Sequence, residues 1–432
     1  MLPTIFAYMN DKKSRSQSGF FVAFCVACAT MRLDNYGDAG YGGSAMKAII
    51  NGKLVYPDYV MDSGAILMDG GKIIASGDVQ VPENAEIIDA QGAYVGPGLF
   101  DIHCHGYAQA GEHPVFCATM EEPGRVAALH LLKGTTSITP TMGYSATPEA
   151  FLKGIELCNE QIKSGDTPIV GIHYEGPYIN PNFGSHSDKC WRYDETMAEK
   201  ILSAAKGNLK HCTYAPEMPG ADKLEEQIIA HGGVPAIGHT AADPESIERA
   251  ASKGAKIVTH LFDAMGSWRG TYWDGGVQQD SAALIALAVP GLYYELICDS
   301  RGIHVPPYCA KMALRTAGED HIILITDCVS RVSHNPNDYP PEDKMSAQDL
   351  NFNEVGGLSG SRLVLAGACA NFIRYAGGDV RMAFKCASTN PAKALNIDDK
   401  IGSILPGRDA NIIFVDEKFA VQKVIFRGEE VV

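Results

Sequence analysis

Residues 95–105 read Val-Gly-Pro-Gly-Leu-Phe-Asp-Ile-His-Cys-His, and this stretch says more about the fold than any other. An apolar run ends there in two histidines, His103 and His105, which are two residues apart. In a β-strand this spacing places both imidazole rings on the same face. Two neutral ring nitrogens on one rigid surface make half of a transition-metal site. The stretch therefore predicts a strand that carries part of a metal centre.

Four further residues with metal-binding side chains stand in or just after similar apolar runs: Glu175, His239, His260 and Asp327. Burying a lone carboxylate is costly unless it is paired or binds a metal. We therefore expect Glu175 to bridge two cations. Asp327 is suited to act as general base and then general acid beside a water whose pKa the metal lowers.

Each of these residues also has a structural interpretation. His103 and His105 could satisfy each other, His239 and His260 could each cap a helix, and Asp327 could be an N-cap. The metal interpretation is favoured because several such residues recur at successive strand ends. For His173, which faces the same side as Glu175 by alternation, we expect a structural role.

Strand-like runs alternate with helical patterns through the middle of the chain. The predicted strands end at His105, Met142, Glu175, Glu217, His239, Met265, His304 and Asp327. The predicted helices include residues 122–133, 147–163, 194–205, 220–231 and 243–253. Eight such units in succession predict a (β/α)8 TIM-type barrel over residues 98–398, and the candidate ligands fall where such barrels place their chemistry.

Both ends of the chain read differently from the barrel. Residues 46–97 and 399–432 are rich in short β-type runs separated by turn residues, which predicts one small β-sandwich built from both termini. Residues 1–45 combine basic residues with an apolar run like that of a signal peptide. We favour an N-terminal extension that is disordered or not native, with translation starting at Met46, over export.

The composition of the chain argues against two classes of binding partner, nucleic acids and membranes. The 432-residue chain has a net charge of −15, which argues against a nucleic-acid binder because such a protein needs a basic face. The apolar run near the N-terminus is too short to cross a membrane, so no membrane partner is expected. The 12 cysteines are scattered, which indicates reduced thiols and a cytoplasmic location.

The residues above occur within longer strings that resemble N-acetylglucosamine-6-phosphate deacetylases of the amidohydrolase superfamily. Two strings are specific to that family: Glu-Gly-Pro-Tyr-Ile-Asn-Pro at 175–181 and Thr-His-Leu-Phe-Asp-Ala-Met at 259–265. Further matching strings lie at 97–106, 173–174, 184–186, 213–217, 238–240, 326–327 and 358–361. The resemblance spans about residues 46–432.

The resemblance implies removal of the acetyl group from an N-acetylated amino sugar phosphate. It implies that Glu175, His239 and His260 hold the metal common to the family, and that His103 and His105 hold a second cation. One or two divalent metals per subunit are expected, with zinc and iron both suited to these ligands. The resemblance also implies a homodimer whose two subunits share the sugar pocket.

The resemblance further assigns roles in catalysis and substrate binding. Asp327 is the expected acid and base, and His186 is expected to polarise the acetamide carbonyl. The expected substrate-binding residues are His304, Asp263, Ala264, Arg301, Arg269 and Ser359.

Two departures from the family pattern concern the phosphate. Asp263 stands where the family has Asn, and Tyr-Trp-Asp-Gly-Gly at 272–276 replaces a segment that carries a phosphate-binding Arg. Both changes weaken the attraction for a dianion, although Arg269 and Arg301 offer compensating charge and His304 keeps its phosphate-contact position.

The departures leave alternative substrates open. These are an unphosphorylated amino sugar, N-acetylgalactosamine 6-phosphate, an N-acyl amino acid, a cyclic amide or an aminopurine. A non-catalytic barrel scaffold is the least favoured reading, because a decayed site should have lost a ligand or its acid/base.

Overall fold

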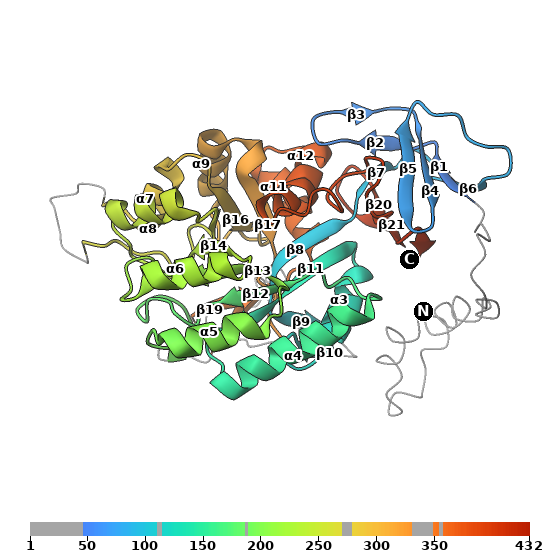
Figure 1. Cartoon of the computed structure of the whole chain (residues 1–432). Coiled ribbons are helices and arrows are strands. Elements are labelled where there is room, and N and C mark those ends of the chain that lie inside the picture. The colour runs from blue at the N-terminus through green and yellow to red at the C-terminus, as the bar shows by residue number, and fades with distance from the viewer. Residues whose placement is uncertain (1–45, 110–114, 186–188, 270–278, 331–348, 354–356) are drawn as a thin grey trace.

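A computed structural model describes residues 46–109, 115–185, 189–269, 279–330, 349–353 and 357–432. A barrel ringed by helices adjoins a smaller all-β unit, which lies at the upper right of Figure 1. The candidate metal ligands all lie in or just after strands of the barrel.

Eight parallel strands form the barrel sheet, in the chain order of their sequence. They are β8 (Leu99–Cys104), β11 (Thr135–Gly143), β12 (Ile172–Glu175), β13 (Leu209–Tyr214), β14 (Val234–Ile237), β15 (Ile257–Val258), β16 (Tyr293–Ile297) and β17 (Ile322–Ile325). The sheet closes between its last and first strands. There the Asp327 amide donates to the His103 carbonyl at 2.9 Å, and the His105 amide to the Cys328 carbonyl at 2.8 Å. The predicted barrel is confirmed.

Helices cover the outside of the barrel (Figure 1). They include α3 (Pro123–Leu131), α4 (Pro148–Ser164), α5 (Glu195–Ala204), α6 (Ala221–Ala230), α7 (Pro244–Lys253), α8 (Ala282–Ala288), α9 (Pro307–Ala317) and α11 (Leu365–Ala376). Helix α4 illustrates why they form. The Thr147 side chain caps its first turn, Gly165 ends it in the left-handed conformation, and Phe151, Ile155 and Cys158 make its buried stripe.

The predicted helices agree with α3 to α7 to within two residues at each end, whereas three predicted strand ends are wrong. Strand β13 ends at Tyr214 rather than Glu217, β15 at Val258 rather than Met265, and β16 at Ile297 rather than His304. The reason is that the chain leaves the sheet while its side chains stay buried, as Ala215 and Leu261 do. An apolar sequence pattern indicates which side chains are buried, not where a strand ends. Because side chains stay buried in the loops at the barrel mouth, the pattern places these strand ends too late.

The small β unit combines both ends of the described chain. A four-stranded sheet runs in the order β5 (Lys72–Gly77), β4 (Ala65–Asp69), β1 (Lys47–Ile50), β6 (Glu86–Asp89). A six-stranded sheet runs in the order β22 (Glu429–Glu430), β21 (Val421–Phe426), β20 (Ile412–Val415), β7 (Tyr94–Pro97), β2 (Lys53–Val55), β3 (Val60–Met61).

A shared hydrophobic core joins these two sheets. Ile49 and Ile66 of the four-stranded sheet pack in one buried cluster with Val95, Ile412 and Ile425 of the six-stranded sheet. Because β20 pairs with β7 along its whole length, the sandwich needs residues from both termini. The predicted sandwich is thereby confirmed, whereas the predicted domain boundaries stay predictions.

Shorter elements complete the described structure. Two hairpins, β9 (Gly106–Gln109) with β10 (Val115–Ala118) and β18 (Leu350–Phe352) with β19 (Leu358–Ser361), follow β8 and β17. The short helix η2 (Glu319–His321) leads into β17, and the chain returns to the sandwich through α12 (Val380–Phe384), the π-helical turn η3 (Lys385–Thr389) and α13 (Asn390–Ala394).

The buried Lys385 joins the barrel side to the β-sandwich. Its ammonium lies 2.9 Å from Asp58 Oδ1 in the sandwich and 3.0 Å from Glu319 Oε1 near the barrel. The Lys385 side chain is only 2% exposed, whereas Asp58 is 80% exposed and Glu319 28% exposed, so the carboxylates reach this ammonium from the solvent side.

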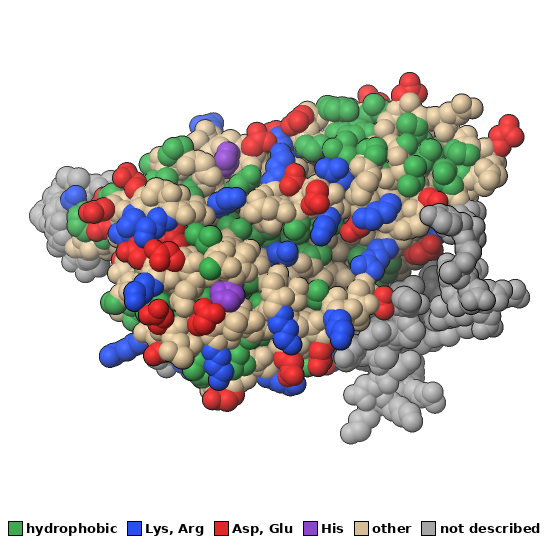
Figure 2. Space-filling model, in the orientation of Figure 1, with side chains coloured by type: hydrophobic (Ala, Val, Ile, Leu, Met, Phe, Trp, Pro, Cys, Tyr) green, Lys and Arg blue, Asp and Glu red, His purple; other side chains and the backbone are tan. Residues whose placement is uncertain are grey.

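The surface and the cysteines bear on the partner predictions. On the face shown in Figure 2, acidic and basic side chains are intermixed over the barrel helices, and hydrophobic ones gather on the β-sandwich. The ten cysteines in the described ranges are all free thiols. Within the same ranges, the helices are all too short or too polar to cross a lipid bilayer.

Candidate metal centre and active site

The first two candidate ligands lie at the end of β8. His103 is fully buried within the strand, and His105 follows one residue after its end with a side chain that is 20% exposed. Their Nε2 atoms are 3.3 Å apart. The i, i+2 spacing therefore brings both imidazoles to one side of the strand, as the sequence predicts.

Three further site residues share an unusual backbone conformation. His239, His260 and Asp327 each stand two residues beyond the end of their strand, β14, β15 and β17 respectively. Their φ angles are 49°, 30° and 47°, in the left-handed region that non-glycine residues rarely adopt. Such a conformation costs of order 1–3 kcal/mol per residue and persists where the surroundings hold it in place. Turn residues such as Asn51 and Lys206 share this conformation, so its interest here is that it recurs at three equivalent positions after barrel strands.

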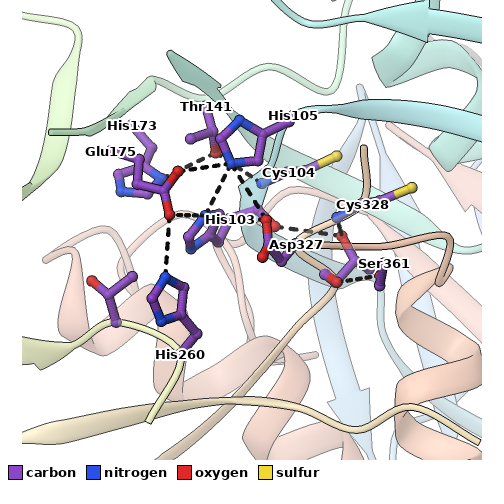
Figure 3. A network of polar contacts seen from close by, with 12 residues as sticks. His103, Cys104, His105, Thr141, His173, Glu175, His260, Asp327, Cys328 and Ser361 are labelled. Carbon is purple, nitrogen blue, oxygen red and sulfur yellow. Dashed lines mark hydrogen bonds and ion pairs between the residues drawn. The ribbon is translucent and has the colours of Figure 1, made fainter. Parts of the chain in front are cut away.

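Glu175, the last residue of β12, lies at the centre of the cluster. Its Oε1 atom is 2.9 Å from His239 Nε2, 3.2 Å from His260 Nε2 and 3.3 Å from His103 Nε2. Its Oε2 atom is 3.1 Å from His105 Nε2. Figure 3 shows this carboxylate between the rings. Oε1 thus faces His239, His260 and His103, and Oε2 faces His105, so the carboxylate reaches both groups of histidines.

Asp327 completes the cluster from the opposite side. Its Oδ1 atom is 3.3 Å from His105 Nε2 and 3.5 Å from His103 Nε2 (Figure 3). The potential ligand atoms therefore form two groups, one of His103, His105 and Asp327 and one of Glu175, His239 and His260. Within each group they lie within 4.8 Å of one another.

The hydrogen bonds of the imidazoles show whether these residues fit a metal. His239 Nδ1 faces the Phe183 carbonyl at 3.1 Å, and His260 Nδ1 faces the Asp263 carbonyl at 3.2 Å. A carbonyl oxygen can only accept, so Nδ1 carries a proton in both rings, and Nε2 presents a lone pair whenever the ring is neutral. Yet the two Nε2 atoms are 3.0 Å apart. Two lone pairs that converge beside a carboxylate fit a divalent cation, and N/O ligands suit zinc or iron.

The protein's own charges favour protonated imidazoles when no cation is bound. Burial lowers the pKa of His105, but Glu175 and Asp327 outweigh it and raise that pKa to about 9. Burial likewise opposes the charge of His260, and Glu175 and Asp263 raise its pKa to about 9.

The two carboxylates respond in the opposite direction. Burial raises the pKa of Glu175, but the neighbouring histidines, His103 foremost, hold it well below its usual range. Burial also raises the pKa of Asp327, and His103 and His105 more than reverse the effect. Both carboxylates are therefore anionic near neutral pH and attract cations into the barrel mouth.

A cavity of about 800 Å³ opens over this cluster. Five of the six expected metal and acid/base residues line it, the exception being the buried His103. Three expected substrate-binding residues, Asp263, Ala264 and Ser359, line it as well. The side chains of Lys153 and Lys189 add positive charge to its wall.

The other expected substrate-binding residues lie elsewhere. Arg269 stacks on Trp268 at 4.9 Å and pairs loosely with Asp280 at 3.7 Å, and neither Arg269 nor Arg301 lines the cavity. His304 is buried, with Nδ1 3.1 Å from Asp299 Oδ2. Its Nε2 atom has no hydrogen-bond partner in the described part of the chain. His186 and residues 272–276 lie outside the described residues.

Two further polar residues, His173 and Glu295, lie buried beside the cluster. His173 bonds through both nitrogens to the hydroxyls of Thr141 and Thr213, each at 3.0 Å, which agrees with the structural role expected for it. Glu295 was not predicted. It is fully buried on β16, and its Oε2 atom is 3.3 Å from His103 Nδ1. The available signal was a carboxylate inside the apolar run Tyr-Tyr-Glu-Leu-Ile.

A closed parallel barrel with His and carboxylate ligands converging at the C-terminal ends of its strands defines a class of metal-dependent hydrolase. Comparison with known proteins agrees. The model of the Amidohydrolase family matches residues 94–431, and the chain belongs to this family.

Curated relatives are N-acetylglucosamine-6-phosphate deacetylases. The Bacillus subtilis protein is 27% identical over 390 residues, which cover 87% of this chain and 94% of the relative. The human protein is 27% identical over 416 residues, which cover 91% of this chain and 97% of the relative.

Solved structures of the same description share the fold. The N-acetylglucosamine-6-phosphate deacetylase from Pasteurella multocida superposes with a TM-score of 0.77 at 24% identity, covering 90% of this chain and 100% of that one. The Thermotoga maritima enzyme gives a TM-score of 0.73 at 24% identity, covering 89% and 99% of the two chains.

Proposed function

We propose that this chain is a metal-dependent deacetylase that hydrolyses the acetamide of N-acetylglucosamine 6-phosphate or a close analogue. The observation that carries the proposal is the convergence of six side chains, remote in sequence, beneath one cavity. The names of the curated relatives support the substrate.

The residues suggest a division of labour. Glu175, His239 and His260 would hold one cation, and His103 with His105 a second. A divalent cation bound there supplies a Lewis acid and lowers the pKa of water.

Asp327 would move the proton in this reaction. It lines the cavity, is 7% exposed and has a lowered pKa, so it is ready to accept a proton from water. The same carboxyl can then deliver that proton to the departing amine. The neighbouring histidines would orient the carboxylate through its Oδ1 atom, which faces His105.

Substrate hydroxyls would bind along the wall of the cavity. Asp263 lines that wall beside the histidines and offers hydrogen-bond acceptors. Ser359 contributes a hydroxyl that lies 3.1 Å from the hydroxyl of Ser185. These contacts orient a sugar without contributing to the chemistry itself.

Asp263 also favours a second candidate substrate, the unphosphorylated amino sugar. A fixed negative charge in the wall repels a phosphate dianion. The competition between this charge and the two lysines of the wall decides which sugar binds better.

The test is acetate release from four substrates by metal-loaded protein. These are N-acetylglucosamine 6-phosphate, its galactosamine isomer, N-acetylglucosamine and an N-acetylated amino acid. We expect the first to be hydrolysed with the highest kcat/KM. If only the amino acid releases acetate, the assignment to sugars is wrong.

Three finer expectations belong with this proposal. The bound metal is expected to be zinc or iron, which elemental analysis of protein purified without added metal would identify. A homodimer is expected from the family resemblance, and light scattering would measure its mass. The cytoplasmic location rests on the scattered reduced thiols.

A further inference from the structure

We infer that Glu295 is a positioning residue that orients ligands of both metal groups from inside the barrel. The inference rests on the proposed metal centre and extends it to a residue that neither the sequence motifs nor the comparisons point to. It concerns how the ligands are held and does not depend on which substrate is hydrolysed.

Strand alternation directs Glu295 into the barrel. Its neighbour Tyr294 points outward, where its hydroxyl donates to the Ala286 and Val289 carbonyls beside helix α8, each at 3.0 Å. Successive side chains of a strand point to opposite faces, so the Glu295 carboxylate points toward the barrel axis. It is 0% exposed.

One oxygen of this carboxylate contacts two candidate ligands. Glu295 Oε2 is 3.3 Å from His103 Nδ1 and accepts the backbone N–H of His260 at 3.2 Å. A carboxylate accepts and does not donate when ionised, so the His103 proton lies on Nδ1 and its Nε2 atom faces Glu175 and His105. The same contact holds the backbone of His260, which is in the strained left-handed conformation.

The remaining polar surroundings of Glu295 do not satisfy its carboxylate. The other oxygen, Oε1, has no hydrogen-bond partner among the described residues and lies 3.9 Å from His211 Nε2. A buried carboxylate left half unsatisfied is costly to keep. Carboxylates that accept from the second nitrogen of a ligating imidazole fix its tautomer and raise its basicity, and their loss weakens metal binding 10- to 100-fold.

The experiment compares three variants by titrating Zn²⁺ against a competing chromophoric chelator. Glu295→Met removes the acceptor, Glu295→Asp draws it away from His103, and Glu295→Gln keeps an acceptor oxygen at the same reach. We expect Zn²⁺ affinity to fall about 10- to 100-fold in the Met and Asp variants and to be largely rescued by Gln. The visible spectrum of Co²⁺-loaded protein should shift in the same order, because it reports ligand geometry.

A matched control separates ligand positioning from the loss of any buried carboxylate. Glu225 on α6 is also buried, at 1% exposure, and one of its carboxylate oxygens likewise has no hydrogen-bond partner among the described residues. Glu225→Met and Glu225→Asp should alter thermal stability and leave Zn²⁺ affinity unchanged. If Glu295→Met does not fold, the Asp and Gln variants still decide the question.

The outcomes distinguish this inference from the proposed function. If the Met and Asp variants bind Zn²⁺ as tightly as the native chain, the role of Glu295 is refuted while the deacetylase proposal stands. If the native chain binds Zn²⁺ but releases no acetate from any substrate, the proposed function fails and the titration still judges Glu295. A native chain that binds no Zn²⁺, Fe²⁺ or Co²⁺ overturns both.

Discussion

The chemistry of this site depends on which nitrogen of each imidazole is protonated. Three rings are fixed by three different oxygens: the Phe183 carbonyl holds His239, the Asp263 carbonyl holds His260, and the Glu295 carboxylate holds His103. Each oxygen binds the Nδ1 proton and so turns the Nε2 atom toward Glu175. The fold therefore sets the orientation of each ring before any cation arrives, and a cation that displaces the Nε2 proton meets the lone pair.

At this scale the acid/base assignment can be tested directly. Replacing Asp327 with Asn keeps the shape of the side chain and removes its ability to take a proton. We expect kcat to fall by about 10²- to 10⁴-fold, the usual contribution of a positioned acid/base group. Steady-state kinetics with metal content measured in parallel would check this. An Asn variant of native activity would remove Asp327 from the mechanism.

The number of cations can be tested at His103. His103→Asn removes a ligand of one group and leaves Glu175, His239 and His260 in place. We expect elemental analysis to show one metal fewer per chain if two are bound. Full activity in the variant would mean that one metal suffices for the reaction.

At the scale of elements, the ligands stand on loops that start where the strands stop. His239, His260 and Asp327 occupy equivalent positions after β14, β15 and β17. The rigid sheet fixes where each loop starts, and the left-handed residue turns its side chain across the mouth.

Glu217 ties together the loops that follow β12, β13 and β14. It accepts from Asn180 Nδ2 at 2.8 Å, from the Thr240 hydroxyl at 2.5 Å and from the Ala241 amide at 2.8 Å. Glu217→Ala leaves those donors without an acceptor, so we expect a loss of about 1–3 kcal/mol in the free energy of unfolding. Chemical denaturation would measure it.

Metal affinity should fall in the same variant, because Thr240 directly follows His239. The control is Glu226→Ala on helix α6, whose side chain is 72% exposed and 3.8 Å from Lys253. That control should change stability by less than about 1 kcal/mol. Equal effects of the two substitutions would contradict a special role for Glu217.

Elements with strong periodicity could be predicted from the sequence, and the details of the mouth could not. Helix α4 has a capping Thr147, an amphipathic stripe and a terminal Gly165, so its bounds follow from local physics. The end of β15 does not, because Leu261 stays buried after the strand has ended.

The candidate site likewise contains residues that the sequence predicts and one that it does not. The six predicted ligand and acid/base residues could be found because each ends an apolar run. Glu295 lies in the middle of one, and its role depends on His103, which is 192 residues away in the chain. Only the closed barrel brings the two together.

At the scale of the whole molecule, the charge state of the site couples to stability. Without metal, His105 and His260 have pKa values of about 9 in the folded protein, against 6.5 when unperturbed. Raised pKa values mean that the folded state binds more protons than the unfolded state between these limits. Their contribution to stability is thus fully present below about pH 6.5 and is lost as the pH rises to about 9.

We therefore expect the Tm of chelator-treated protein to fall by several degrees between pH 6.5 and pH 9. A bound cation replaces those protons, so the Tm of the metal-loaded protein should fall less over the same pH range. The difference in Tm between the metal-loaded and the chelator-treated protein should therefore widen as the pH rises. Scanning calorimetry of both forms would show it. A gap that narrows with rising pH would contradict the charge states described here.

The pairing of β20 with β7 has a consequence for how the molecule is made. Pro97 is aligned with Ile412 in that ladder, so nearly the whole chain must leave the ribosome before the two strands can meet. Until then the first strands of the sandwich have an open edge that other chains or chaperones can bind. Synthesis of this protein thus ends, rather than begins, with the completion of its first domain.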